Sequence, residues 1–170
     1  SAVTVWAAHI PAVEKQLSLT HAQIGIIILI LGAGALASMQ IVGNLIDRLG
    51  SAKVLKWISV GLGASLMLPG MANAFLTLAI AIFILGVMIG GIDIAMNAHA
   101  LEVERAYDRP IFSAFHAMWS IGGVVGSAVA STALVLGSSM ALSMATWGAL
   151  TIAVGLLISK NLLASAASQE

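Results

Sequence analysis

Residues 57–92 read WISVGLGASLMLPGMANAFLTLAIAIFILGVMIGGI, without a single Asp, Glu, Lys or Arg. Because crossing a bilayer takes roughly 20 apolar residues, this stretch is long enough for two membrane-spanning helices. Pro69, Gly70 and Asn73 lie in its middle and are residue types that favour turns. The stretch therefore predicts a helical hairpin embedded in a membrane.

The rest of the chain repeats this pattern. Further charge-free stretches run from Gln16 to Ile46 and from Ile111 to Ser159, the second divided near Gly137. Of the 170 residues, 60% are hydrophobic and 8% are charged, whereas soluble domains have about 25% charged residues. We expect an all-α membrane protein, a six-helix transmembrane bundle whose first helix is truncated. The expected helices are 1–8, 21–46, 53–71, 74–98, 111–136 and 140–159.

Local signals mark two of the helix starts. Thr20 and Gln23 have the spacing of a capping box, in which each side chain bonds the backbone of the other residue. Pro110 suits the first turn of a helix, and Asp108 just before it complements the helix dipole. The second expected helix therefore begins after Thr20 and the fifth near residue 110.

Short connections make consecutive helices antiparallel neighbours in one bundle, residues 1–160, followed by a cytoplasmic tail or the start of a central linker, residues 161–170. Lys15 lies on one side of this bundle. The other basic residues lie on the opposite side: Arg48, Lys53, Lys56, Arg105, Arg109 and Lys160. Since basic residues in short loops stay in the cytoplasm, residues 47–56 and 99–110 are predicted to be cytoplasmic and residues 9–20 external.

Composition and motifs exclude several other classes of function. The formal net charge is zero, which gives no reason to expect nucleic acid as a partner, and the absence of cysteine excludes disulfides and thiolate metal sites. His99, Glu102 and Glu104 beside Arg105 fit a solvated loop better than a metal site. We find no paired nucleophile and base, phosphate-binding loop or zinc spacing. The sequence thus predicts a lipid-embedded protein that is not an enzyme and has no cofactor or metal.

The loop between the second and third expected helices reads GNLIDRLGSAK, residues 43–53. Asp47 ends one helix, and Arg48 and Lys53 lie near the start of the next. Two interpretations stay open: an ordinary positive loop, or a charge cluster that latches helix ends together.

This segment resembles the signature loop of the major facilitator superfamily, G-x-x-x-D-R-x-G-R-[KR]. The matching residues are Gly43, Asp47, Arg48 and Gly50, while Ser51 and Ala52 replace the usual basic pair and Lys53 is the nearest substitute. The resemblance implies that Asp47 and Arg48 help to hold the cytoplasmic ends of two halves of a transporter together when it faces outward.

Residues 91–99, GIDIAMNAH, and 115–123, FHAMWSIGG, are similar to a bacterial branch of the superfamily related to fucose-permease-like carriers. The resemblance covers essentially the whole chain. It implies the N-terminal half of a secondary transporter of the bacterial inner membrane, which moves a small polar solute by alternating access at a midplane site shared with a missing C-terminal six-helix half. Features of proton antiporters are absent from the fourth and fifth helices, which favours symport or uniport. The alternative is a non-transporting membrane-embedded binding or assembly protein.

Asp93 and Asn97 are four residues apart and share a helical face. An ionisable residue inside a span costs about 2.5 kcal/mol or more to insert, which makes Asp93 a candidate for substrate binding or proton coupling. The alternative is a solvated position at the cytoplasmic interface, because residues 74–92 already supply enough apolar positions for a span.

The fifth expected helix carries a stripe of small and polar residues: Ser113, His116, Ser120, Gly123, Ser127 and Ser131. Such a stripe either lines a cavity or lets another helix pack closely. His116, with Trp119 nearby, is the second candidate for a substrate or proton role. Two glycine pairs, 86 with 90 and 122 with 126, have the G-x-x-x-G spacing of packing surfaces, and the missing half is one partner they could contact.

Overall fold

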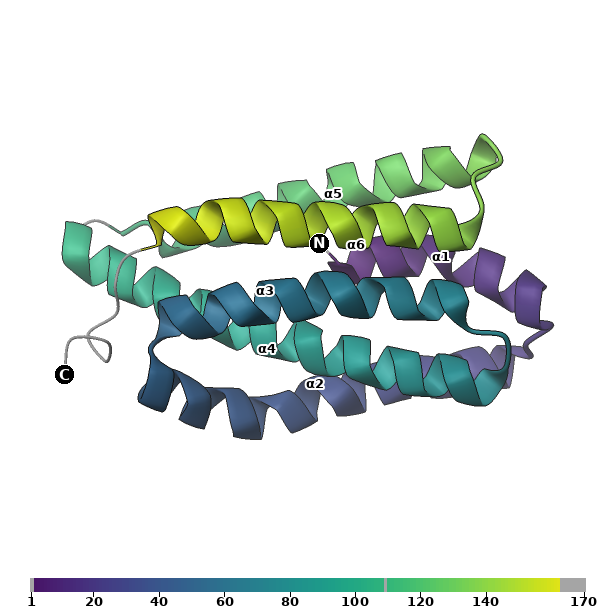
Figure 1. The fold of residues 1–170 in the computed structure, drawn as a ribbon, viewed down its shortest axis with the longest axis horizontal. Helices are drawn as coiled ribbons and strands as arrows, with labels where there is room; N and C mark the ends of the chain where they lie inside the picture. Colours follow the sequence, from purple (N-terminus) through teal and green to yellow (C-terminus); the bar gives the residue numbers. More distant parts are fainter. Residues whose placement is uncertain (1, 109, 163–170) are drawn as a thin grey trace.

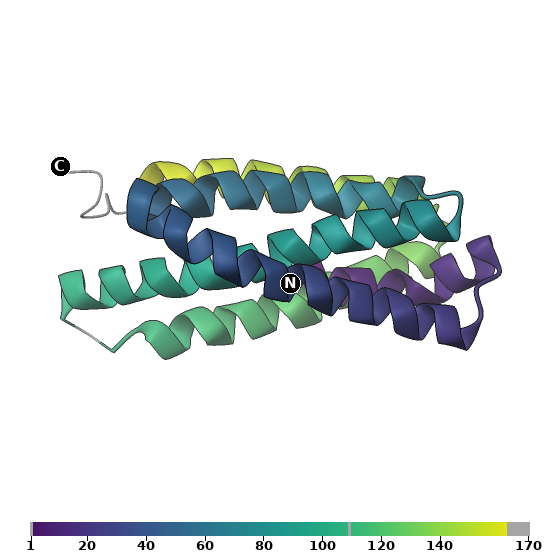
Figure 2. The ribbon, with the colours of Figure 1, turned by 90° about the horizontal axis from the view of Figure 1, so that it is seen from below.

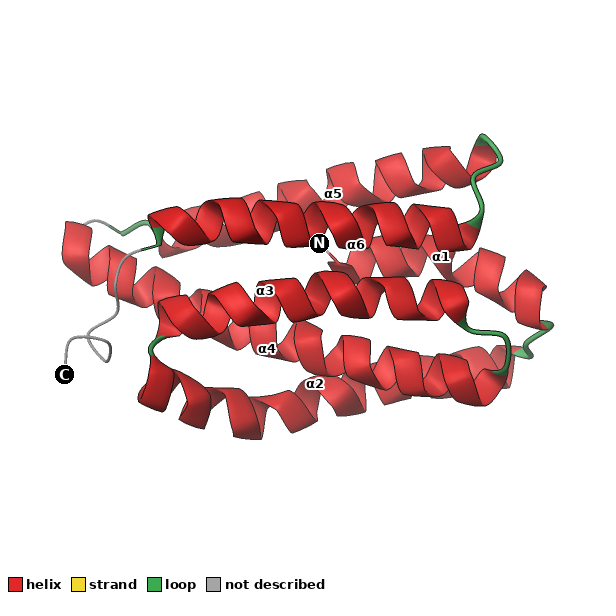
Figure 3. Ribbon diagram, in the orientation of Figure 1, coloured by secondary structure: helices red, strands yellow, loops and turns green. Residues whose placement is uncertain are grey.

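The computed structural model describes residues 2–108 and 110–162. In these residues it contains helices and no strand (Figure 3). The α-helices are α1 (Ala2–Leu17), α2 (His21–Leu49), α3 (Ser51–Met67), α4 (Phe75–Tyr107), α5 (Phe112–Val135) and α6 (Met140–Ile158), and two 3-10 segments are η1 (Leu68–Met71) and η2 (Ser159–Asn161). The predicted fold class, a six-helix bundle of a membrane protein, is confirmed.

Five of the helical segments are long and apolar enough to cross a membrane, namely α2, α3 with η1, α4, α5, and α6 with η2. All helices run along the long axis of the molecule, as two perpendicular views show (Figures 1 and 2). The α2–α3 connection, the end of α4 and the start of α5 lie at one end of the bundle, and the α1–α2, α3–α4 and α5–α6 connections lie at the other (Figure 1). The chain therefore forms a multi-pass bundle of antiparallel neighbours.

The basic residues follow this alternation. Arg48, Lys53, Lys56, Arg105 and Lys160 belong to the end that holds the α2–α3 connection, hereafter the basic end, and Lys15 belongs to the other (Figure 1). The predicted segregation is confirmed for these residues, and Arg109 lies outside the described residues. That the basic end faces the cytoplasm stays a prediction.

Close packing between helices depends on glycine. A Cβ atom on Gly90 would lie 2.5 Å from the carbonyl oxygen of Ala35, and one on Gly86 would overlap the carbonyl of Leu31, so α4 packs tightly on α2 at both positions. The predicted Gly86–Gly90 packing surface is confirmed, but its partner is α2 of this same bundle and not a missing half. In α5 the glycine pair Gly122 and Gly126 does not form one packing surface, because Gly126 is buried whereas a Cβ on Gly122 would meet nothing.

Two helices are longer than the sequence predicted. α1 continues through Pro11 to Leu17, since Val13 is buried in the core at 1% exposure and anchors the last turns. α4 continues to Tyr107, because His99 and Ala100 are buried where a loop was expected. The predicted loops at 9–20 and 99–110 were therefore too long, and most of each is helix.

The predicted capping box is confirmed: the Thr20 hydroxyl accepts from the backbone N–H of Gln23, and the Gln23 side chain accepts from that of Thr20. α5 begins at Phe112, close to the predicted start, but the group that caps it is different from the prediction. The backbone N–H of Phe112 donates to the Glu104 carboxylate at 2.8 Å, so Glu104 caps this helix. Asp108 instead ends α4 in a left-handed conformation, φ 48°.

Candidate functional site

Asp93 is a half-buried carboxylate on α4 that lacks a partner. It makes no hydrogen bond or ion pair with any other residue that the structure describes. Asn97, one turn further along the same face, has its Oδ1 atom buried without a hydrogen-bond partner among the same residues. Unsatisfied polar atoms next to an ionisable group on a membrane helix indicate a place where another group binds.

The depth of Asp93 follows from the contacts on either side of it. A Cβ on Gly91 would touch Ile58 and Val42, and His99 bonds Ser51 at the start of α3. Asp93 lies six residues before His99, which is about 9 Å along a helix. It therefore lies about two turns inside the first residue of α3 and only about 4.5 Å from the level of Gly90, which packs on Ala35 at the middle of α2.

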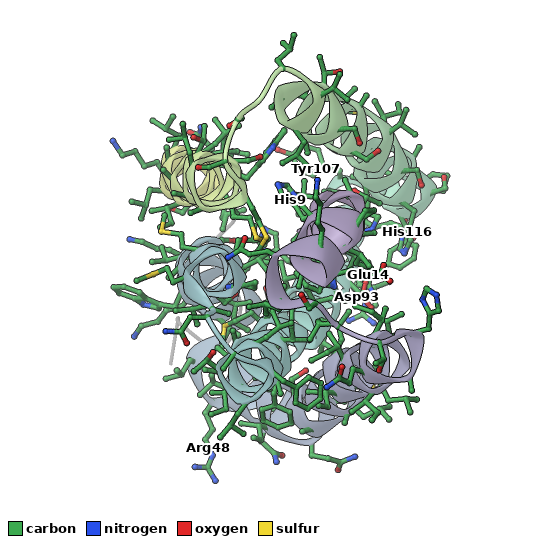
Figure 4. The ribbon with its side chains drawn as sticks, turned by 90° about the vertical axis from the view of Figure 1, so that its right-hand side faces the viewer. His9, Glu14, Arg48, Asp93, Tyr107 and His116 are labelled. Carbon is green, nitrogen blue, oxygen red and sulfur yellow. The ribbon has the colours of Figure 1, made fainter. Side chains whose placement is uncertain are left out.

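His116 and Trp119 occupy the first two turns of α5, also toward the basic end. His116 is exposed, its ring packs on Phe112 with centroids 4.9 Å apart, and its Nδ1 lies 3.5 Å from the Phe112 carbonyl oxygen. Trp119 is half-buried and packs against the core. Figure 4, which looks along the helices, shows Asp93 inside the cross-section of the bundle and His116 and Arg48 at its periphery.

The polar stripe on α5 both packs and lines a cavity. At Gly123 it packs on α1, where the Thr4 hydroxyl donates to the Gly123 carbonyl at 3.0 Å. Beside this contact a shallow cavity of about 270 Å³ is lined by Thr4, Trp119, Ser120, Gly123, Val124 and Ser127. His116 is absent from that lining. The structure thus places Trp119, but not His116, in a cavity that polar and apolar residues line together, and it joins neither of them directly to Asp93.

The signature loop is exposed at the basic end. Asp47, Arg48 and Lys53 are all exposed and form no ion pair with another described residue. Gly50 adopts φ 83°, a conformation that glycine reaches without strain, and joins α2 directly to α3. Gly43 has open space where a Cβ would point. Gly50 therefore makes the turn between α2 and α3, whereas a Cβ on Gly43 would meet no other part of this bundle.

His99 and Glu102, which were expected in a solvated loop, instead lie on α4 and form a cluster with Ser51 next to the signature loop. The Ser51 hydroxyl donates to the Glu102 carboxylate at 2.8 Å and lies 2.9 Å from Nδ1 of His99. His99 is buried on the extension of α4, and its Nδ1 lies 3.8 Å from the Glu102 carboxylate. A serine protease triad needs an accessible nucleophile and a carboxylate that orients the histidine. Ser51 is 0% exposed and the carboxylate bonds the serine itself, so the cluster fastens α3 to α4.

A second missed contact joins α1 to α6. His9 is 0% exposed, its Nδ1 lies 2.7 Å from the Val5 carbonyl, and its Nε2 lies 2.9 Å from the Ser143 hydroxyl. Since the Val5 carbonyl can only accept, Nδ1 carries the proton and Nε2 accepts from Ser143. Both ring nitrogens are satisfied, and His9 is structural. The only sequence signal was a histidine in an apolar segment.

A family model described as Major Facilitator Superfamily matches residues 2–168. The chain belongs to the major facilitator superfamily. An uncharacterized MFS-type transporter of Yersinia pestis is 33% identical over 161 residues, which cover 95% of this chain and 42% of that protein. The similarity to this transporter extends over nearly the whole bundle.

Two rhizobial proteins are also similar to this major facilitator chain. An uncharacterized transporter of Sinorhizobium fredii is 42% identical over 72% of this chain and 33% of its own length. Membrane protein MosC of Rhizobium meliloti is 28% identical over 73% of this chain and 30% of its own length. The chain thus spans less than half the length of each of these relatives. No solved structure matches significantly.

Proposed function

We propose that this major facilitator chain is the N-terminal half of a secondary active transporter that moves a small polar solute across the bacterial inner membrane by alternating access. Family membership and relatives named as transporters support transport. The structural observation that carries the proposal is Asp93, a half-buried carboxylate on a membrane helix without a partner in the described residues.

The role that we propose for Asp93 is proton coupling. Asp93 lies about two turns inside the start of α3 and slightly toward the basic end from the middle of α2, so it is near the midplane where the alternating-access site is expected. A carboxylate there can accept a proton when it is shielded from water and release it when the basic end opens. The transporter is accordingly a proton symporter in this proposal, with Asp93 as the proton-binding group and the buried Asn97 amide oxygen as its neighbour.

Exposed glycines support a second half as partner. Glycines inside this bundle, such as Gly34, Gly86 and Gly90, are crowded by a neighbouring helix. On α2 and α5, by contrast, Gly25, Gly32, Gly43 and Gly122 have nothing within 4 Å of a Cβ position. Small residues on membrane helices allow close approach of another helix. We therefore assign the open faces of α2 and α5 to contact with the C-terminal half.

The exposed loop fits the same proposal. Asp47, Arg48 and Lys53 lie at the basic end with no partner in the described residues, as expected for charges that pair across two halves. In the proposed cycle they close the basic end when the transporter faces outward and separate when it opens inward.

The test is gradient-driven uptake by the full-length transporter in proteoliposomes, comparing wild type with Asp93→Asn. The substitution preserves size and removes the titratable charge, so we expect loss of accumulation driven by a pH gradient, with substrate exchange retained. Glu14→Gln is the matched control, since Glu14 lies at the other end of the bundle, 3.2 Å from the exposed His21.

Three outcomes separate the alternatives. Loss of both accumulation and exchange in Asp93→Asn would make Asp93 a substrate ligand. Unchanged accumulation and pH dependence would remove Asp93 from the mechanism. Absence of any uptake by folded, correctly inserted wild-type protein would favour the non-transporting binding or assembly role.

A further inference from the structure

Trp57 is a large aromatic side chain on the outer surface of α3, where it is 61% exposed. The ammonium group of Lys56 lies over its ring, 5.7 Å from the centroid, which is a cation–π contact. Side chains on a helix lean toward its N-terminus, so both residues point toward the basic end, where α3 begins. The pair therefore holds a positive charge beside an apolar ring at this end of the bundle.

A second positive charge comes from a distant part of the sequence. Lys160 is exposed on η2, which follows α6 directly. α6 packs closely on α3, and η2 contacts α3 as well. Lys56 and Ser159 line the same cavity of about 400 Å³, so Lys160, the next residue, lies beside the start of α3. The end of α6 and the start of α3 also reach the same level along the bundle, whereas α4 continues past both (Figure 1).

No acidic side chain balances these two charges within the part of the chain that the structure describes. α3, α6 and η2 contain neither Asp nor Glu, and neither lysine forms an ion pair with another described residue. The Glu102 carboxylate on α4 accepts from Ser51 and fastens α4 to α3. An anionic partner therefore complements this surface, because basic residues at a membrane surface attract negative headgroups.

The outer surface of α3 and α6 fits a lipid environment better than contact with another helix. Both helices are long and apolar enough to cross a membrane. Each of their four glycines is crowded by a neighbouring helix of this bundle, for example Gly63 by the carbonyl oxygen of Gly148. Glycines with open space lie on α2 and α5, the faces assigned above to the second half. This step rests on that assignment, and it leaves α3 and α6 to the bilayer.

We propose that Lys56, Trp57 and Lys160 form a binding site for an anionic phospholipid in the leaflet at the basic end. Lys56 lies five residues, about 7.5 Å, inside the first residue of α3, and its long side chain extends from there to the headgroups. The lipid phosphate lies beside the two ammonium groups, and the Trp57 ring packs on the glycerol and the upper acyl chains. A zwitterionic lipid binds more weakly, because its own cationic group is repelled by the lysines.

The test uses the full-length transporter in phosphatidylcholine vesicles that contain a trace of photoactivatable phosphatidylglycerol, or of photoactivatable phosphatidylcholine for comparison. Labelled peptides are identified by mass spectrometry. Lys56→Gln combined with Lys160→Gln removes the site. Lys15→Gln combined with Arg105→Gln is the matched control, because it removes the same charge from exposed residues at the opposite end of the bundle and on the extension of α4.

We expect phosphatidylglycerol to label the segments 54–60 and 154–162 at least about fivefold more than phosphatidylcholine does, and the excess to disappear in the Lys56→Gln, Lys160→Gln variant. The control variant, and Lys56→Arg combined with Lys160→Arg, should keep it. In the wild type, unlabelled phosphatidylglycerol should compete and unlabelled phosphatidylcholine should not, which tests the site without any substitution.

Three results would overturn the proposal. Equal labelling by the two lipids would show that the surface does not select for charge. An excess that persists without both lysines would place the selectivity elsewhere. Absence of labelling by either lipid would show that protein covers this surface of α3 and α6.

Discussion

Ser51 and His99 are 48 residues apart in the sequence and lie in hydrogen-bond contact, with 2.9 Å between the serine hydroxyl and Nδ1. The hydroxyl has one proton and donates it to Glu102 at 2.8 Å, so it accepts from His99, whose proton is then on Nδ1. Ser51 occupies the place of a basic residue in the family's signature loop. A neutral hydroxyl therefore fastens the start of α3 to the extension of α4.

Ser51→Ala is expected to destabilise the bundle. It leaves the buried His99 and the Glu102 carboxylate without their shared partner, at a cost of about 1–3 kcal/mol. Thermal unfolding followed by circular dichroism in detergent measures the loss. Ser113→Ala, at an exposed serine, is the control and should leave the unfolding curve unchanged. Equal stability of both variants would show that the cluster contributes nothing.

Two glycine substitutions should have opposite effects on the 170-residue chain. Gly90→Ala introduces a Cβ 2.5 Å from the Ala35 carbonyl oxygen and should destabilise by about 1–3 kcal/mol, because the two helices must separate. Gly25→Ala, where a Cβ meets nothing, should be neutral or stabilise by up to about 1 kcal/mol through better helix propensity. Unfolding midpoints of the two variants provide the comparison. A stable Gly90→Ala protein would contradict the tight α2–α4 contact.

The basic end should be cytoplasmic. Single cysteines at Leu49 and Gln16, both exposed and at opposite ends of the bundle, can be labelled in intact cells with a membrane-impermeant maleimide. We expect Gln16→Cys to react from outside and Leu49→Cys to react only after lysis. The reverse pattern would invert the topology. Ser51, although it lies in the same loop, is unsuitable because it is 0% exposed.

Asp47→Asn should slow transport by the full-length protein without lowering its abundance. Asp47 is exposed and makes no ion pair in the described residues, so the isolated bundle does not need it for folding. The rate of uptake at matched surface expression is the measurement, with a decrease of about tenfold expected if one charge-assisted contact of about 1.4 kcal/mol is lost at the gate. Wild-type rates would restore the interpretation of an ordinary positive loop.

Local sequence patterns predicted most of the helices. Residues 57–92 form the predicted hairpin, with the connection at residues 72–74 directly after the 3-10 turn η1 that contains Pro69 and Gly70, and Thr20 caps α2 as its spacing indicated. These features depend on neighbours in the sequence, so a single chain carries enough information. The extension of α4 could not be predicted in this way, because it is stabilised by the contact between His99 and Ser51, which are 48 residues apart.

The candidate site was predictable only in part. The residue types of Asp93 and Asn97 indicated a polar position on a membrane helix, but their depth depends on how α4 aligns with α3, which the contacts of Gly91 and His99 reveal. For His116 the sequence predicted a position that the structure does not contain. Its place in a small, polar stripe suggested a cavity, whereas the cavity is lined by Trp119 one turn later.

The unequal contacts between helices give the bundle two mechanical parts. α2, α3, α4 and α6 are joined by extensive contacts, with glycine-mediated approach at Gly86, Gly90 and Gly63. α1 and α5 pack mainly on each other and touch the remaining helices at few places. The α1–α5 pair therefore has fewer contacts to the other helices than those four helices have to one another. If the helices move apart at the basic end, the separation should begin between α5 and its neighbours other than α1, because the fewest contacts are lost there.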